Sequence, residues 1–460
     1  DQDNNVIKSY KFTIPSGSHV GQDYSALIRG ERYVYYAPFE MGNHRISVRK
    51  TPDNQGALVS AETFYKENEE TYTVYNFNLF DVNVLSTADH GTSQNPYLIS
   101  NEEDFVNIKL RANKYTYMTS YVNKDNQVVS TEQTYSFVQT ADIEITQTIT
   151  GYLVNSFKNV YDGAGYKLTY NLVNSGSNAS LINTISESGI VKNLRLDVTL
   201  RPTNSTITFA SVALNNSGKV SNSVLENVSI ASNSASINYA GFVYNNSGRL
   251  ERLVSKASFT AGNVTNAGAI VYSNSRSVAT VYQCGNIGNI TLNGVNLSQK
   301  LGGIAISNSG TIDECYNKGT LTLNSNVTEI QMGGIVAQNS TNSTIINTYN
   351  TGKIVLEGNH TNVSFGGIVG YSANNNIVNS YSVQVITSPV GGISDTMSYG
   401  AIVGRLSSSI SERNNYYAQG STSGIGNYVS TTFAKSVSVS EMKNDNFVVT
   451  INGGDTAFMK

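Results

Sequence analysis

Cysteine, tryptophan and histidine are scarce in this chain of 460 residues, which has two cysteines, no tryptophan and four histidines. Two cysteines cannot build a disulfide framework. The histidines, His19, His44, His90 and His360, lie far apart, and no His-x-x-x-His or Cys-x-x-Cys spacing occurs. Clustered His and Cys ligands are what transition metals require, so we expect no such metal site.

Charge is also scarce. Charged residues make up 14% of the chain, the net charge is −3 and the isoelectric point is about 5.9. Binding to nucleic acid requires a basic stripe against the phosphates, so we do not expect DNA or RNA as a partner. No apolar run is long enough to cross a bilayer, so we expect no membrane span in this segment.

The remaining composition is dominated by Ser, Thr, Asn and Gly, with 39 glycines and 29 tyrosines. The chain begins at Asp1 and shows no apolar segment of the signal-peptide kind, so we expect a mature exported protein or a cut piece of one. This composition favours an extracellular protein at a cell surface. A cytosolic protein rich in Asn and Gln is the alternative.

Residues 1–88 carry short segments rich in aromatic and β-branched residues, separated by Gly, Pro, Asn or Asp. They predict a small antiparallel β-sandwich, and residues 86–93 read as the linker that follows it. The segments are Tyr10 to Ile14, Tyr33 to Tyr36, His44 to Val48 and Thr71 to Tyr75.

A repeat governs the rest of the chain. Its best copies are Gly302-Gly303-Ile304-Ala305, Gly333-Gly334-Ile335-Val336 and Gly366-Gly367-Ile368-Val369. Units start at 180, 210, 240, 268, 302, 333, 366 and 400, a spacing of 28–34 residues. Within a unit we expect the Gly-rich strand, a turn, a second strand, an Asn-x-Gly turn such as Asn317-Lys318-Gly319, and a third strand.

Three short strands with alternating apolar residues cannot bury their faces alone, so the units must stack. Stacking gives three parallel sheets around one core. The fold class is therefore all-β, a right-handed parallel β-helix of about eight rungs. Paired glycines suit a narrow corner, Asn and Gly tolerate positive φ at the turns, and stacked turns suggest ladders of Asn side chains.

The Gly-Gly-Ile-Val-Gly blocks followed by Tyr-Asn-x-Gly turns resemble the GLUG-type repeats of bacterial surface proteins and adhesins. The segment Gly91 to Ile99 resembles the entry sequence of such arrays, and Phe157 to Tyr166 resembles their first turn. The resemblance covers residues 91–460 and implies the coil together with a role at the bacterial surface.

Two segments match the capping box Ser-x-x-Glu and predict short helices that close the ends of the coil. These are Ser100 to Glu103, followed by Phe105, Ile108 and Leu110, and Ser438 to Glu441, followed by Met442, Phe447 and Val448. The predicted domains are a β-sandwich at 1–88, an entry region at 89–179, the repeats at 180–435 and a capping segment at 436–460.

Catalytic candidates are few. Asp313 and Glu314 are the only adjacent acidic pair in the regular rungs, and their equivalents are Tyr282 and Gln283 one rung back and Ile346 and Asn347 one rung on. We therefore interpret the pair as solvated surface charge and expect no catalytic residue. The block Gly366 to Gly370 lacks the Lys-Ser/Thr of a phosphate loop, so no cofactor is expected. Calcium is a weak candidate at Asp53-Asn54 and Asp125-Asn126, which offer too few ligands.

Cys284 and Cys315 occupy the same place in neighbouring repeats, followed by Thr348 and Ser380. Stacked strands lie about 4.8 Å apart, which is inside the range of Cα separations for a disulfide. A disulfide between rungs is therefore open. The favoured alternative is a stack of small side chains with free thiols, because in-register neighbours point in parallel.

These observations predict a non-catalytic extracellular surface protein that acts as an adhesin or rigid display rod. Its partners would be other copies of itself or glycans and proteins of a cell surface. One alternative is a subunit of an extracellular filament, in which Tyr10, Phe12 and Ile14 pair with the edge of a neighbour. Another is a polysaccharide-active enzyme, which needs carboxylates grouped on one exposed sheet.

Overall fold

The computed structural model describes residues 24–28, 32–37, 45–50, 57–65, 71–78, 91, 96–111, 116–122, 128–203, 206–231, 236–293 and 298–451. The chain divides into two compact units, one formed by residues 1–97 and 117–133 and the other by residues 98–116 and 134–460.

The described strands of the first unit pair in the antiparallel way. β1 (Tyr24–Ile28), β2 (Arg32–Ala37) and β3 (Arg45–Lys50) form one sheet, and β4 (Ala57–Tyr65) pairs with β5 (Thr71–Asn78). β7 (Thr116–Val122) and β8 (Val128–Thr134) form a third pair. Packing as a sandwich stays a prediction. The expected assembly strand of Tyr10, Phe12 and Ile14 and the proposed linker, apart from Gly91, lie outside the described residues.

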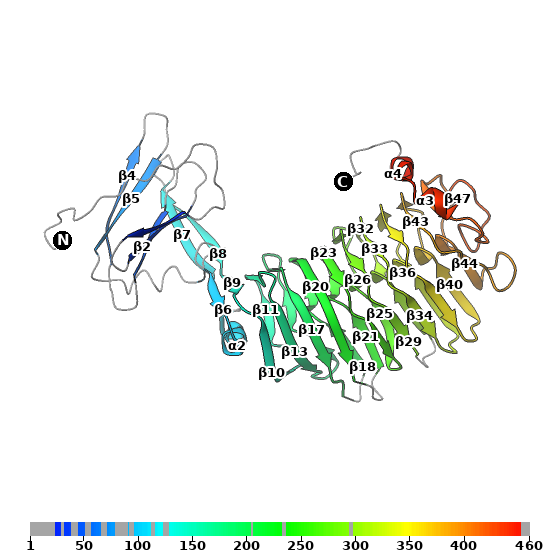
Figure 1. The fold of residues 1–460 in the computed structure, drawn as a ribbon, viewed down its shortest axis with the longest axis horizontal. Helices are drawn as coiled ribbons and strands as arrows, with labels where there is room; N and C mark the ends of the chain where they lie inside the picture. Colours follow the sequence, from blue (N-terminus) through cyan, green and yellow to red (C-terminus); the bar gives the residue numbers. More distant parts are fainter. Residues whose placement is uncertain are drawn as a thin grey trace. The chain divides into compact units, whose positions relative to one another are not determined.

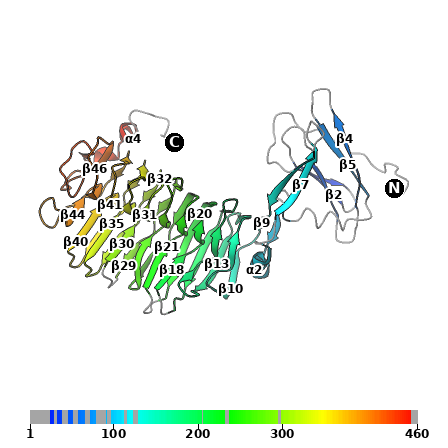
Figure 2. The same cartoon turned by 180° about the vertical axis from the view of Figure 1, so that it is seen from behind.

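The second unit is a parallel β-solenoid of about eight turns, which confirms the predicted fold class (Figure 1). Each regular rung crosses four sheets in turn. One such rung consists of β30 (Ser298–Gly302), β31 (Ala305–Asn308), β32 (Thr311–Asp313), β33 (Tyr316–Asn317) and β34 (Leu321–Asn324). Strands that are about 30 residues apart in sequence lie side by side, and the view from behind shows the same stacking (Figure 2).

Two of the four sheets flank the paired glycines. The eight-stranded sheet contains β14 (Asn178–Ala179), β18 (Thr206–Ala210), β21 (Ser236–Ala240), β25 (Val264–Gly268), β30 (Ser298–Gly302), β35 (Glu329–Gly333), β40 (Asn362–Gly366) and β44 (Met397–Gly400). The nine-stranded sheet contains β11 (Val154–Phe157), β15 (Ile182–Ile185), β19 (Ala213–Asn216), β22 (Val243–Asn246), β26 (Val271–Asn274), β31 (Ala305–Asn308), β36 (Val336–Asn339), β41 (Val369–Ser372) and β45 (Val403–Leu406).

The other two sheets complete each rung. The four-stranded sheet contains β24 (Phe259–Ala261), β29 (Ile290–Leu292), β34 (Leu321–Asn324) and β39 (Ile354–Glu357). The long sheet contains β6 (Tyr97–Ile99), β9 (Ser136–Gln139), β10 (Ile143–Thr150), β12 (Val160–Asp162), β13 (Lys167–Val173), β16 (Ile190–Lys192), β17 (Arg195–Leu200), β20 (Lys219–Ile230), β23 (Arg249–Ser255), β27 (Thr280–Tyr282), β28 (Gly285–Asn286), β32 (Thr311–Asp313), β33 (Tyr316–Asn317), β37 (Thr344–Ile346), β38 (Tyr349–Asn350), β42 (Ile377–Val378), β43 (Tyr381–Ser382), β46 (Asn415–Ala418) and β47 (Ala434–Val437).

The register of the stack is the one that the repeat predicts. Residues that start the repeat units pair directly, in the order Ala210, Ala240, Gly268, Gly302, Gly333, Gly366 and Gly400. Small residues occupy this position in every rung because the corner is crowded. A Cβ on Gly303 would lie 2.1 Å from the carbonyl oxygen of Gly334 in the next rung.

The Asn-x-Gly turns work differently from the expectation that they need positive φ. The glycine of such a turn, for example Gly319, is not among the positive-φ residues, and it is needed because a Cβ would lie 1.9 Å from the carbonyl oxygen of Gly288. The asparagines form the predicted ladders. The Nδ2 of Asn286 donates to the Oδ1 of Asn317, and Asn317 donates to Asn350, each at 2.8 Å.

A second asparagine ladder lies at the end of the nine-stranded sheet, and each of its side chains is buried. Each Nδ2 donates to the next Oδ1 at 2.8–2.9 Å, through Asn216, Asn246, Asn274, Asn308 and Asn339. These ladders satisfy buried amides that would otherwise oppose folding.

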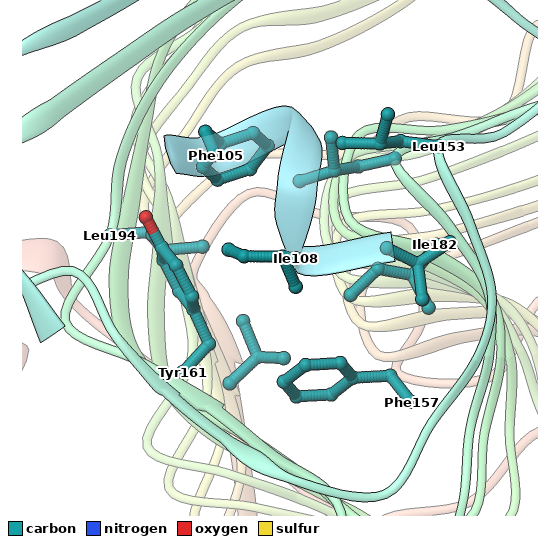
Figure 3. Close-up of a pocket in the computed structure, with 10 residues that line it drawn as sticks. Phe105, Ile108, Leu153, Phe157, Tyr161, Ile182 and Leu194 are labelled. Atoms are coloured by element: carbon teal, nitrogen blue, oxygen red, sulfur yellow. The ribbon is translucent and has the colours of Figure 1, made fainter. Parts of the chain in front are cut away.

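The predicted N-terminal capping helix is α2 (Glu102–Arg111). Phe105 and Ile108 are buried against the first rungs, where they face Phe157 and Tyr161 (Figure 3). The cap begins one residue later than expected. The N–H of Asp104 donates to the Oδ1 of Asn101, and the Asp104 carboxylate accepts from Ser100. Leu110 has no described side-chain environment.

The predicted C-terminal cap consists of α3 (Val439–Met442) and α4 (Asp445–Ile451), and Ser438 is the N-cap residue as predicted. The pair packs against the last strands of the long sheet. Phe447 meets the rings of Tyr381 and Tyr416 edge-on, at centroid distances of 5.4 and 5.2 Å. Among the described residues, no helix is both long and apolar enough to cross a membrane.

Candidate binding surface on the long sheet

A bend in the long sheet repeats at the same place in seven successive rungs. One residue there has a positive φ of 50–57°, and it separates the first strand segment of the rung from the second. The seven bend residues are Asn193, Asn222, Arg252, Gln283, Glu314, Asn347 and Asn379. Positive φ is unusual for Arg, Gln and Glu, so the stacked strands on both sides must impose it.

We call this surface the outer bend. It comprises the seven bend residues and the outward side chains of the strand segment that precedes each of them. Where such a segment has three residues, the side chain of the middle residue points into the core. Neighbouring rungs are joined there by side chains. Arg252 Nε donates to Asn222 Oδ1 at 2.6 Å, and Asn379 Nδ2 donates to Asn347 Oδ1 at 3.2 Å. The outer bend is thus a polar, ordered strip along the coil.

A hollow opens at the N-terminal end of the outer bend. Side chains from both sides of the bend line it, among them Asp162, Asn193, Arg195 and Asn222. Two ion pairs neutralise the charges next to the hollow, because Lys192 contacts Asp162 at 3.0 Å and Arg195 contacts Glu226 at 2.9 Å.

Glu251 gathers three cations one or two rungs further on. Its Oε2 lies 2.9 Å from Lys219 Nζ and 2.7 Å from Arg249 Nε, and its Oε1 contacts Arg252 Nη1. The glutamate is 5% exposed, whereas the three cations are between one third and one half exposed. The cluster therefore presents an excess of two positive charges to solvent.

Burial opposes the ionisation of Glu251, but hydrogen bonds and charges from Arg249 and Lys219 outweigh it and lower its pKa from 4.5 to about 2. As the pH falls from about 4.5 toward 2, Glu251 therefore binds a proton in the unfolded chain but not in the folded chain. The stability that the ionised Glu251 contributes is lost over that pH range. We expect Glu251→Gln to flatten that loss in urea unfolding at pH 6 and pH 3. Glu187→Gln, at an exposed glutamate, is the control and should leave the pH dependence unchanged.

Two carboxylates follow two rungs after Glu251. Asp313 pairs in register with Tyr282, which pairs with Glu251. Asp313 accepts from Asn347 Nδ2 at 3.0 Å, and Glu314 accepts from Gln283 Nε2 at 2.8 Å. Burial, reinforced by the charge of Glu314, raises the pKa of Asp313. Neither carboxylate has an ion-pair partner among the described residues, so both charges stay uncompensated.

A row of tyrosines lies beside the outer bend. The Tyr316 ring lies over Gly285, where a Cβ would be 2.1 Å from the ring, and it stacks on Tyr349 with centroids 5.4 Å apart. Tyr349 stacks on Tyr381 at 5.3 Å, and Phe447 of α4 closes the row. The Nζ of Lys318 lies 5.1 Å from the Tyr316 centroid. The row forms a firm wall along one side of the strip.

The structure places the two cysteines as the repeat predicts, in neighbouring rungs and fully buried. Both thiols are free, and the Cys284 N–H points to the Sγ of Cys315 at 3.4 Å. Burial raises the pKa of the Cys315 thiol, which makes it a poor nucleophile. The sequence left a disulfide between these rungs open and favoured free thiols, and this arrangement does not test either alternative.

The other candidate ligands do not come together. Within the described part of the chain, no group of three or more His, Cys, Asp or Glu side chains has the arrangement of a metal site. His360 lies between the backbone carbonyls of Val327 and Glu357. The calcium candidates Asp53-Asn54 and Asp125-Asn126, together with His19, His44 and His90, lie outside the described residues.

The sequence predicts that Asp313 and Glu314 are an isolated acidic pair on an otherwise neutral face. The structure confirms that Asp313 pairs with the uncharged residues Tyr282 and Ile346 in the adjacent rungs. It missed the cluster around Glu251 because it searched for adjacent acids only. The signal was present. Aligning the repeats brings Lys219 beside Arg249 and Glu251 beside Tyr282.

The fold and this surface define the class of the protein as a polar parallel β-solenoid. Comparison with known proteins does not narrow this class further. No known family profile and no curated protein matches the chain. One similar solved structure, from Bacteroides ovatus and named as an immunoglobulin A1 protease, has 15% identity and a TM-score of 0.39, covering 59% of this chain and 85% of its own. A second, named IgA1 protease, has 12% identity and a TM-score of 0.37, covering 80% of this chain and 27% of its own.

Both of these structures are named for an enzyme. This finding contradicts the prediction of a non-catalytic adhesin, display rod or filament subunit, and with it the expectation that the chain belongs to no enzyme. The composition misled us because a neutral, Asn-rich coil shows how the scaffold is built and carries no information about catalysis.

Proposed function

We propose that the outer bend is a recognition surface for an extended polypeptide. The observation that carries this proposal is the order of its charges. Three cations surround the single carboxylate of Glu251, and two uncompensated carboxylates, Asp313 and Glu314, follow two rungs later. A complementary ligand must carry both signs of charge.

Polypeptides meet that requirement more readily than polysaccharides, because natural glycans commonly carry acids and seldom carry cations. The geometry supports an extended ligand, since the strip follows the coil axis and successive rungs contribute side chains to it. Such a surface would hold a polymeric substrate for a peptidase. The GLUG-type nature of the repeats and an extracellular location belong to the same proposal, which the Ser-, Thr- and Asn-rich composition supports.

Binding of the full chain to two arrays tests this proposal, one of 12-residue peptides that carry both, one or neither sign of charge, and one of acidic and neutral glycans. We expect the peptides with both charges to bind best, and their binding to weaken when salt is raised from 50 to 500 mM, because the contacts are exposed and screened. Binding to glycans with no binding to any peptide would overturn the proposal. Mass spectrometry of the recovered peptides tests the peptidase part, since cleavage leaves two fragments.

A further inference from the structure

The cation cluster on the outer bend has N–H donors that Glu251 does not use. Glu251 takes one N–H from each guanidinium and one from Lys219. Arg252 Nε is used by Asn222, and the guanidinium carbon of Arg249 lies 5.1 Å from the Tyr282 ring centroid. Among the described residues, the two terminal nitrogens of Arg249 and Nη2 of Arg252 have no hydrogen-bond partner, so these donors face solvent in a fixed arrangement.

Glu251 is what fixes that arrangement. A buried carboxylate bonded to three cations holds long side chains that would otherwise lose rotamer entropy on binding a ligand. An incoming carboxylate therefore meets a preorganised subsite with a net charge of +2.

The second subsite is made by Asp313 and Glu314. Their described partners are neutral donors, namely Asn347, Gln283 and the hydroxyl of Tyr282 at 3.4 Å from Glu314. Lys318 is on the same rung but stands over the ring of Tyr316. A ligand cation would consequently find two carboxylates with no competing ion pair.

The spacing of the subsites selects a conformation. Two rungs separate them, which is about 10 Å at the spacing of parallel strands. In a polyproline II helix, residues i and i+3 lie on one side and about 9 Å apart. In a β-strand the same side recurs at i+2 and i+4, about 7 and 13 Å apart, which fits the subsites less well.

We infer that the outer bend selects peptides in the polyproline II conformation that carry an acidic and a basic side chain three residues apart. The acid binds Arg249 and Arg252, the base binds Asp313 and Glu314, and Tyr282 and Gln283 form the floor between them. This inference rests on the proposed function and specifies its substrate class.

Fluorescence anisotropy of labelled proline-rich peptides with the full chain tests the inference. The peptides carry one Glu and one Lys separated by two, three or four positions, in both orders. The other spacings can engage only one of the two exposed charge pairs at a time, so we expect the i,i+3 peptide in one order to bind about fivefold tighter than they do. A glycine-rich peptide with the same charges should bind more weakly, because it must be ordered first.

Two substitutions locate the subsites. Arg252→Ala should weaken the i,i+3 peptide severalfold without affecting one whose Glu is replaced by Gln. Glu314→Lys should abolish the preference for Lys over Gln at the basic position of the peptide, because the charge of the second subsite changes from −2 to 0. The bend tolerates a long basic side chain, as Arg252 shows. Arg276→Ala, at an exposed arginine away from the outer bend, is the control and should change nothing.

The outcomes separate the two proposals. Equal binding at all spacings, or a Glu314→Lys variant with unchanged preference, overturns the inference and leaves polypeptide recognition standing. Failure of every charged peptide to bind the folded chain overturns both.

Discussion

Replacing Gly334 with alanine should lower the melting temperature of the coil by about 3–4 °C, which for a unit of this size corresponds to about 2–3 kcal/mol. The new Cβ would lie 2.2 Å from the carbonyl oxygen of Gly367 and 2.6 Å from Asn350 Cγ. Neither neighbour can yield, because one is backbone and the other belongs to a buried ladder. Rungs on both sides would have to separate.

Gly392→Ala is the matched control. No heavy atom lies within 4 Å of the position of its added Cβ, and its φ is not in the left-handed region. Calorimetry of the two variants beside the parent chain would decide. Equal melting temperatures for Gly334→Ala and Gly392→Ala would refute the account of the crowded corner.

The second large effect is expected from Asn317→Leu, which keeps the number and branching of the side chain's heavy atoms and removes its amide. Asn317 donates to Asn350 at 2.8 Å and to the carbonyl of Gly319 at 3.0 Å, and it accepts from Asn286. The change leaves the Oδ1 of Asn350 without its donor and one Nδ2–H of Asn286 without its acceptor, so we expect a loss of about 2–4 kcal/mol in the free energy of unfolding.

Urea unfolding of Asn317→Leu measures this loss, with Asn342→Leu as the control at an exposed turn. Leucine is more hydrophobic than asparagine. If the ladder were only packing, Asn317→Leu would be neutral or stabilising, and that result would contradict the role assigned to it.

The register of the coil could be predicted because the residues that set it occur only for one reason. Gly303 and Gly334 recur at the rung spacing because only a small residue fits the corner, and Ala269 and Ala401 take the same place in other rungs. The asparagines of the turns recur because each one hydrogen-bonds to the next. The N-cap of α2 lies one residue later than predicted, because Ser100 and Asn101 are both good N-cap residues. The sequence does not show which carboxylate hydrogen-bonds back to the start of the helix.

The outer bend could not be predicted in this way. Its positive φ is imposed by the strands on either side, so Arg252, Gln283 and Glu314 carry no sign of it. Its function depends on charges from different rungs, such as Arg249 and Asp313, that become neighbours only when the register is known. Reading each repeat alone therefore showed a neutral scaffold.

The positive-φ bend has one further consequence. Since the backbone there holds the same shape with Asn, Arg, Gln or Glu in place, the bend conformation does not dictate which residue stands at each bend. Single substitutions at the bend residues can therefore change the side chains of the strip while its backbone stays the same. Related coils with the same glycines and asparagines could then differ entirely in what they recognise.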